Sequence, residues 1–252
     1  MNMIVCIKQV PDTNEVKINQ ETGTLIRDGG PSIINPDDKN AIEGALALKD
    51  QHGGHVTVLC MGPQQAKDAL KEALAMGADE AILLSDRAFA GSDTWATSTI
   101  LAAAIEAIGN YDIVFCGRQA IDGDTAQVGP ETAEFLNLPQ VTYAKEIRKD
   151  EDSLEVTRFT EYGDYVIRVK MPVLLTAVKE LNNPRLPSVR GIFKAYSTDE
   201  VKVWTAEDIR IDLTQIGLKG SPTNVFRSFV PVKEKNSQII DGLNGKEKAS
   251  LL

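Results

Sequence analysis

A glycine-rich loop contains the densest group of residues that could bind a ligand. It runs from Gly117 to Pro130, between an apolar run that predicts a buried strand and a predicted helix start. The three glycines of the loop are Gly117, Gly123 and Gly129. They would let the backbone approach a ligand closely, Thr125 and Gln127 add side-chain donors, and free N–H groups at a helix start suit a diphosphate. The spacing is neither GxGxxG nor a P-loop, so a nucleotide-binding loop and an ordinary glycine-rich connection both stay open.

The cysteines and histidines give little support to other chemistry. Cys6, Cys60 and Cys116 lie at the ends of apolar runs without CxxC or Cys/His spacing. A disulfide framework, a zinc site and an iron–sulfur cluster are therefore disfavoured, and we expect the cysteines to pack in the core of a cytoplasmic protein. His52 and His55 flank a Gly-Gly turn and are expected to face solvent, so no metal site is predicted.

Charge and hydropathy exclude further classes. Lys+Arg 27 against Asp+Glu 36 gives a net charge of −9 over 252 residues, which disfavours nonspecific binding to nucleic acid or to anionic membranes. No apolar run approaches the roughly 18 to 20 residues of a membrane helix, so no membrane insertion is expected.

The first half of the chain alternates short apolar runs with helical patterns. The runs that predict strands are Met3–Ile7, Val56–Cys60, Ala81–Leu84 and Ile113–Cys116. The alternation is typical of βαβ units and predicts an α/β fold, a mostly parallel sheet with helices on both faces. Ligands of such sheets bind beyond the carboxyl ends of the strands, where the glycine-rich loop begins.

Helix start signals lie between these runs. Asn35 offers a capping amide, Pro36 suits the first helical position, and Asp37 and Asp38 place negative charge in the first turn of a helix expected over about 36–51. Ser92-Asp93 predicts the cap of a later helix. Further helices are predicted over 66–76, before the stop signal Gly77, and from Gly129-Pro130 through Leu136.

The pattern changes after Pro139. The β-rich segments there are 141–147, 154–159, 165–169 and 173–178, which predict an antiparallel addition to the sheet. From Asn182 onward prolines and glycines recur with little periodicity, which predicts an extended C-terminal arm that buries against another surface. We therefore expect an α/β nucleotide-binding domain over 1–181 and a recognition loop with an arm over 182–252.

Motifs spread along most of the chain indicate a family. They are Val5–Asp12 (VCIKQVPD), Ile34–Asp38 (INPDD), Ala73–Asp79 (ALAMGAD) and the loop Gly117–Pro130. Together they resemble the small (beta) subunit of electron-transfer flavoproteins, which implies an adenine nucleotide alpha hydrolase-like fold and a large (alpha) partner subunit. A segment over 184–195 looks like the part of that family that docks the partner dehydrogenase.

The resemblance also implies a nucleotide lying across the strand ends. The residues expected to contact it are Cys6, Asn35, Asp37, Asp38, Met61, Gly117, Arg118, Gln119, Ala120, Asp122, Gly123, Asp124, Thr125, Ala126, Gln127, Val128 and Gly129. Arg118 is either a surface arginine or a partner for phosphate or reduced flavin. Asp93, Thr94 and Thr97 form the helix start after the third strand, so contact with a flavin ring stands beside simple capping.

Two groups of the family differ in the nucleotide. Conventional subunits hold structural AMP, whereas electron-bifurcating ones hold an FAD that accepts a hydride from NADH. The loop over 122–130 (DGDTAQVGP) is similar to the second group, and Thr13 and Asp37 stand where some AMP-type members have aromatic residues. The resemblance thus favours FAD, with AMP as the alternative.

The bifurcating group implies particular partners. One electron would pass to ferredoxin or flavodoxin and the other to the FAD of the large subunit, which serves an acyl-CoA or lactate-type dehydrogenase. Positions expected to dock that dehydrogenase are Leu186, Val189, Ile192 and Phe193, and the alternative is that these apolar residues belong to the core. A ligase or stress-type ATP-binding module would need a phosphate loop and catalytic groups that the sequence lacks, and a pure scaffold would bind no nucleotide.

Overall fold

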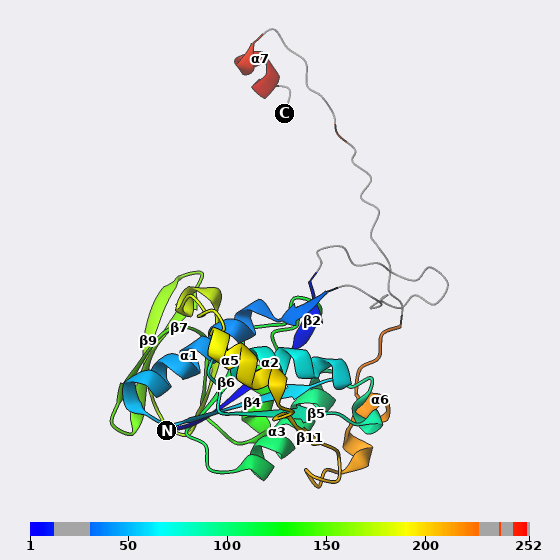
Figure 1. The fold of residues 1–252 in the computed structure, drawn as a ribbon. Coiled ribbons are helices and arrows are strands. Elements are labelled where there is room, and N and C mark those ends of the chain that lie inside the picture. Colours follow the sequence, from blue (N-terminus) through cyan, green and yellow to red (C-terminus); the bar gives the residue numbers. More distant parts are fainter. Residues whose placement is uncertain (13–30, 227–236, 238–243, 251–252) are drawn as a thin grey trace. The chain divides into compact units, whose positions relative to one another are not determined.

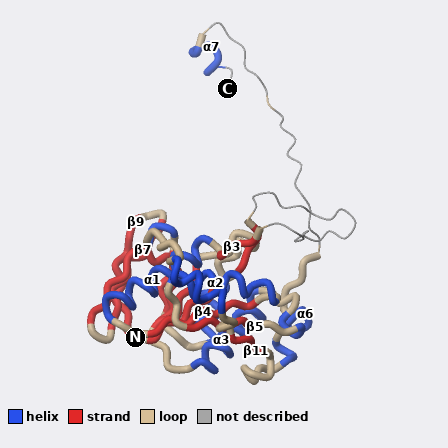
Figure 2. The backbone as a smooth tube through the Cα atoms, in the orientation of Figure 1, coloured by secondary structure: helices blue, strands red, loops and turns tan. Residues whose placement is uncertain are grey.

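A nine-stranded sheet forms the centre of the described part of the chain (Figures 1 and 2). The computed structural model describes residues 1–12, 31–226, 237 and 244–250. The strand order is β11-β5-β4-β1-β6-β10-β7-β8-β9. The strands are β1 (Asn2–Ile7), β4 (His55–Met61), β5 (Glu80–Leu84), β6 (Ile113–Gly117), β7 (Gln140–Asp150), β8 (Ser153–Thr160), β9 (Gly163–Lys170), β10 (Val173–Ala177) and β11 (Lys202–Trp204). A separate antiparallel pair consists of β2 (Gln9–Pro11) and β3 (Ser32–Ile34).

Helices cover both faces of the parallel part, as the sequence predicted (Figure 1). They are α1 (Pro36–His52), α2 (Lys67–Met76), α3 (Thr94–Ile108), α4 (Val128–Phe135), α5 (Val189–Ser197) and α6 (Gly217–Gly220). Short 3-10 turns occupy Gln64–Ala66, Arg87–Phe89, Lys179–Leu181 and Leu213–Gln215. None of the described helices is long and apolar enough to cross a membrane.

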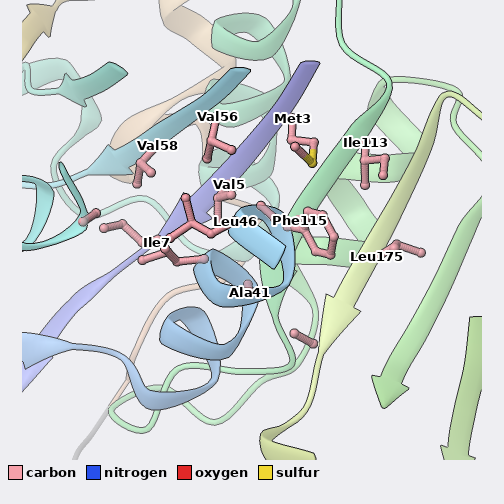
Figure 3. Close-up of a cluster of buried hydrophobic side chains, with 14 of the residues drawn as sticks. Met3, Val5, Ile7, Ala41, Leu46, Val56, Val58, Ile113, Phe115 and Leu175 are labelled. Atoms are coloured by element: carbon pink, nitrogen blue, oxygen red, sulfur yellow. The ribbon is translucent and has the colours of Figure 1, made fainter. Parts of the chain in front are cut away.

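Alternate residues of β1 pack on opposite faces of the sheet, because successive side chains of a strand point to opposite sides. Met3, Val5 and Ile7 belong to the core beneath α1 and α2, while Ile4 and Cys6 belong to the core beneath α3 and α4. Figure 3 shows Ala41 and Leu46 of α1 beside the first of these sets. Each such buried aliphatic side chain contributes about 1.5–3 kcal/mol, and this double core fixes the strand ends that carry the site.

The antiparallel addition is smaller than the sequence suggested. β8 pairs antiparallel with β7 and with β9. β10, however, lies between β6 and β7 and runs parallel to both, so the expectation that segment 173–178 joins the antiparallel addition is wrong. All five residues of β10 are buried, which is typical of a central parallel strand covered on both faces.

The chain after residue 182 contributes to the same compact unit. β11 pairs with β5, and Ala206, Ile209 and Ile216 are buried in the core beneath α3. This unit extends to Asn224, beyond the boundary that we expected at residue 182. A helix α7 (Gly245–Ser250) belongs to a second unit, and most of the remaining residues of the expected arm lie outside the described residues, as does Thr13.

The helix α5 corrects another expectation. The prolines and the glycine of segment 184–195 predicted a loop, yet residues 189–197 are helical. Both prolines precede the cap Ser188, whose hydroxyl accepts the N–H of Gly191 at 2.9 Å. A Cβ on Gly191 would lie 2.3 Å from the carbonyl oxygen of Ala75, so the glycine allows α5 to sit directly on α2. The helix also buries Ala195 one turn later.

Candidate functional site

The carboxyl ends of β1 and β6 lie at the point where the chain changes direction across the sheet. From β1 the chain proceeds to β4 and β5 on one side, and it then returns to β6 on the other side of β1. In open α/β sheets a crevice forms beyond the strand ends at such a point. The glycine-rich loop follows β6 directly, and α1 begins after β3, which pairs antiparallel with β2 just after β1. The topology therefore brings together the motifs from three distant parts of the sequence.

Asp38 links the two central strand ends. Its carboxylate accepts the N–H of Lys8, just after β1, at 2.7 Å and the N–H of Gly117, the last residue of β6, at 3.1 Å. Asp38 is only 6% exposed and has no ion-pair partner in the described ranges. Burial raises the pKa of Asp38 to about 7, against the lowering effect of these hydrogen bonds. Both oxygens are thus used to hold the strands together at the crevice.

Asn35 holds the glycine-rich loop from below. Its amide donates to the carbonyl oxygen of Gln119 at 2.9 Å and accepts the N–H of Ile121 at 3.0 Å. Asn35 is fully buried, and its side chain makes no capping hydrogen bond to α1. The expectation that this amide caps the helix is therefore wrong, because the same atoms are used to order the loop.

Two ion pairs add charge at the loop. Lys8 Nζ lies 2.7 Å from Asp122 Oδ1, and Arg118 Nε lies 3.3 Å from Asp37 Oδ2. Burial raises the pKa of Asp37, while the Arg118 charge opposes that rise. The Nε atom of Arg118 is buried without a hydrogen bond, so its contact with Asp37 is one of charge alone. The remaining donors of the half-exposed guanidinium have no hydrogen-bond partner among the described residues, so they could bind an anion.

The glycines of the loop serve different purposes. A Cβ on Gly117 would lie 2.1 Å from Asp38 Oδ1, so glycine is needed for the approach of α1. A Cβ on Gly129 would lie 2.7 Å from Thr176 Cγ2, so this residue lets α4 pack on β10. A Cβ on Gly123 would meet nothing within 4 Å. Close approach thus occurs between parts of the chain itself at Gly117 and Gly129.

The N–H groups at the end of the loop are arranged so that they could bind an anion. The N–H groups of residues 125–128 donate to no acceptor within the described part of the chain. They precede or begin α4, whose dipole favours negative charge. Asp124 and Ala126 have φ angles of 55° and 54°, a left-handed conformation that non-glycine residues seldom adopt and that concentrates at functional sites. Consecutive free donors of this kind form a site for a phosphate or diphosphate.

The start of α3 lies against the same loop. Thr94 Oγ1 lies 3.5 Å from Gln127 Oε1 and donates to Glu131 Oε1 at 3.2 Å. Asp93 caps α3 by accepting the N–H of Ala96, and its other oxygen accepts the N–H and the hydroxyl of Thr223. These bonds hold the pKa of Asp93 below its usual value despite the opposing effect of burial. The capping role expected for Asp93 is confirmed.

The other candidate residues lie near these strand ends. Met61 ends β4 and is half-buried, and Thr97 is half-buried in the first turn of α3. Cys6 and Cys116 are paired neighbours on β1 and β6. A thiol hydrogen bond with Cys6, together with burial, raises the pKa of Cys116, and burial raises that of Cys60 to about 12. All three cysteines are buried core residues, as predicted, and Cys60 and Cys116 are poor nucleophiles.

Metal chemistry finds no support in the described ranges, where His, Cys, Asp and Glu form no group of three that could hold an ion. A cavity of about 230 Å³ lies elsewhere, at the amino ends of the sheet strands, lined by Asn2, His55 and Glu80 among others. It is separate from the glycine-rich loop. His52 and His55 are exposed, as predicted.

The sequence did not indicate two contributors to the site. The backbone N–H of Lys8 donates to Asp38, and its ammonium group pairs with Asp122. The carboxylate of Glu131 accepts hydrogen bonds from the hydroxyls of Thr94 and Ser98. Lys8 lies within the VCIKQVPD motif, so the sequence could have identified it as a residue of the site. Glu131 stands in the first turn of α4, where an acid is ordinary, so nothing distinguished it.

The segment expected to dock a dehydrogenase is exposed. Leu186, Val189 and Phe193 are 88%, 87% and 75% exposed, and Ile192 is 45% exposed. The alternative that these side chains belong to the core of this chain is therefore wrong. Four apolar groups on a short stretch of surface are characteristic of a contact with another protein.

Comparison with known proteins gives consistent matches. A family described as the electron transfer flavoprotein domain matches residues 22–209. A protein named electron transfer flavoprotein subunit beta, from Thermoanaerobacterium thermosaccharolyticum, is 60% identical over 242 residues, covering 96% of this chain and 93% of the relative. Subunit CarD of the caffeyl-CoA reductase-Etf complex from Acetobacterium woodii is 54% identical, covering 100% and 96%. The acryloyl-CoA reductase electron transfer subunit gamma from Anaerotignum propionicum is 49% identical, covering 98% and 95%.

Proposed function

Because the chain belongs to the electron transfer flavoprotein family, as a small (beta) subunit, we propose that it binds FAD beyond β1 and β6 and receives hydride there from NADH. The two electrons then divide between a low-potential carrier, ferredoxin or flavodoxin, and the FAD of the large (alpha) subunit. That second FAD serves an acyl-CoA or lactate-type dehydrogenase in the cytoplasm. The family itself implies a flavin or AMP at this site, and the choice of FAD is our inference.

The observation that carries the proposal is the row of unpaired N–H groups over residues 125–128 at the start of α4. A diphosphate needs several donors within a few ångströms, and backbone donors at a helix start supply them without a lysine. Asn35 fixes the loop that presents these donors, and Asp38 fixes the strand ends beneath it. The residues present therefore fit a dinucleotide.

Bound FAD supplies hydride acceptance and one-electron transfer, so the chain needs no catalytic acid or base of its own. The task of these residues is to bind and orient. Arg118 has donors beside the loop that are unpaired within the described ranges, and they can offset negative charge on a phosphate or on the reduced ring. We expect Thr94 and Thr97, at the start of α3 beside the loop, to border the ring.

The names of relatives support the dehydrogenase partner. One relative is part of a caffeyl-CoA reductase complex and another is an electron transfer subunit of acryloyl-CoA reductase. We infer that this chain likewise serves a reductase or dehydrogenase, and that Leu186, Val189, Ile192 and Phe193 form the docking surface. Burial of one aliphatic anchor contributes about 1.5–3 kcal/mol, which suits a transient complex.

The identity of the released nucleotide tests the proposal. The chain is co-expressed with its large subunit, the purified heterodimer is denatured, and the released nucleotides are separated and quantified. Two FAD per heterodimer with little AMP is the expected result. One FAD and one AMP would show a conventional subunit instead, which is the alternative function.

The electron donor needs a separate measurement. In stopped-flow mixing, NADH should bleach the flavin held by this chain, and Arg118→Ala should slow that step while the yield of folded heterodimer stays unchanged. Failure of NADH to reduce either flavin in a complex replete with FAD would refute the hydride assignment.

A further inference from the structure

The base of the docking segment is held by an arginine with several partners. Arg185 Nε and its backbone N–H both donate to Glu43 Oε2, at 2.8 and 3.0 Å, and Nη2 donates to Glu43 Oε1 at 3.0 Å. Nη2 also lies 2.7 Å from Asp50 Oδ2. Glu43 is only 9% exposed, whereas the Asp50 side chain is largely exposed. The guanidinium thus makes a bidentate pair with a buried carboxylate of α1, a geometry that lysine cannot reproduce.

A second contact reinforces this attachment. The amide of Asn40 donates to the backbone carbonyl of Asn182 at 2.8 Å, and the amide of Asn182 donates to the carbonyl of Asn40 at 2.9 Å. On the other side of the exposed stretch, the N–H of Ser188 donates to the carbonyl of Ala75 at 3.3 Å. Residues 183–187 therefore span from α1 to α2 and are tied at both ends.

The docking side chains themselves contribute little to this order. Leu186 follows Arg185 directly and Val189 stands one residue after the cap, and both are almost fully exposed. Side chains with so little packing of their own take their arrangement from the backbone that carries them. The hydrogen bonds from Arg185 to the two carboxylates are charge-assisted, so each is roughly twice as strong as a neutral hydrogen bond that fixes this backbone.

We propose that Arg185 is a positioning residue for dehydrogenase docking: through Glu43 and Asp50 it holds Leu186 and Val189 in the arrangement that the partner recognises. This role rests on the proposed docking function of the segment. Ordering the segment before the encounter lowers the entropy lost on binding, since fewer groups remain to be immobilised. Arg185 itself need not contact the dehydrogenase.

The test uses the complete heterodimer with its nucleotides. Arg185→Met keeps an aliphatic side chain but removes the guanidinium group with its paired hydrogen bonds, whereas Arg185→Lys keeps the positive charge. Arg168→Met is the matched control, because Arg168 makes one ion pair, with the exposed Asp150, on the edge strand β9. The measurements are kcat and KM for the flavoprotein in dehydrogenase-coupled turnover, nucleotide content, NADH-driven flavin reduction, and hydrogen exchange over residues 182–197.

We expect Arg185→Met to raise KM about tenfold, the scale implied by ordering two or three additional groups on binding. The value of kcat, nucleotide content and flavin reduction should stay at the levels of the unmodified complex, and exchange over 182–197 should accelerate. Arg185→Lys should give a smaller rise in KM, and Arg168→Met should change none of these measurements.

The outcomes separate the positioning role from docking itself. If Val189→Asp raises KM and Arg185→Met does not, the segment docks the dehydrogenase but the positioning role is refuted. If neither variant changes KM, the proposed docking function fails as well. Should Arg185→Met prevent assembly, Arg185→Lys decides, and an unchanged KM with unchanged exchange in that variant overturns the proposal.

Discussion

The stability of the chain should depend on pH through Asp38, whose carboxylate bridges the ends of β1 and β6. Burial raises its pKa from 3.8 to about 7. The folded chain therefore keeps a proton on this group between about pH 4 and pH 7, whereas the unfolded chain has lost it. Since the folded state binds more protons in this window, its free energy of unfolding decreases as the pH rises.

The size of the effect follows from the shift. One proton of difference changes the free energy of unfolding by about 1.36 kcal/mol per pH unit. Because the folded group is half deprotonated at pH 7, the change between pH 5 and pH 7 is about 2.3 kcal/mol. Asp38→Asn is neutral at every pH and should abolish this component. Between pH 5 and pH 7 the unmodified chain should therefore lose about 2–3 kcal/mol of stability relative to Asp38→Asn.

Urea unfolding at several pH values measures this difference. Trp95, which packs edge-on against Phe135, and Trp204 in β11 report unfolding by fluorescence. Asp79→Asn is the control, because Lys49 and the N–H of Val56 outweigh the effect of partial burial and hold the pKa of Asp79 below its usual value. The contribution of Asp79 is lost only below about pH 4, so its variant should differ from the unmodified chain by a constant amount. A constant difference for Asp38→Asn as well would refute the reasoning.

Three further substitutions test other parts of the structure. Gly129→Val would place a Cβ 2.7 Å from Thr176 Cγ2, so it should destabilise the chain by about 1–3 kcal/mol, and an unchanged Tm would contradict this packing role. Asn35→Ala leaves the N–H of Ile121 without its acceptor, and we expect lower nucleotide content in the purified heterodimer; full content would exclude a role of the loop in binding. Val189→Asp changes a side chain that is 87% exposed, so the Tm should stay constant while dehydrogenase-coupled turnover falls, and normal turnover would remove the docking role.

The sequence predicted the parallel strands and their helices well because burial and periodicity act locally. The continuous apolar runs Met3–Ile7 and Ile113–Cys116 correspond to buried strands, because both faces of a central strand are covered. The parallel pairing of β10 does not follow from its own residues, because the pairing partner of a strand depends on the whole sheet. It follows two antiparallel strands in sequence but crosses back between β6 and β7.

The expectations for Asn35 and Gly129 differ from the structure because each residue type can serve two structural roles. Asn35 has the type and position of a cap, and only the three-dimensional proximity of Gln119 and Ile121 shows that its amide is used elsewhere. Gly129 suggests room for a phosphate, whereas the group it accommodates is the side chain of Thr176. The partner atoms in both cases come from distant parts of the chain, so no local pattern could have identified them.

The helix α1 carries contacts of two kinds along one rod of 17 residues. Asp38, near its start, faces the strand ends, whereas Glu43 and Asp50 face Arg185. Successive residues of an α-helix are rotated by about 100° around its axis. Inserting or deleting one residue between Asp38 and Glu43 would therefore turn the second set of carboxylates away from Arg185 while leaving the first in place. The number of residues between Asp38 and Glu43 therefore sets the relative direction of the two groups of carboxylates. Substitutions within this stretch should be tolerated far better than insertions or deletions.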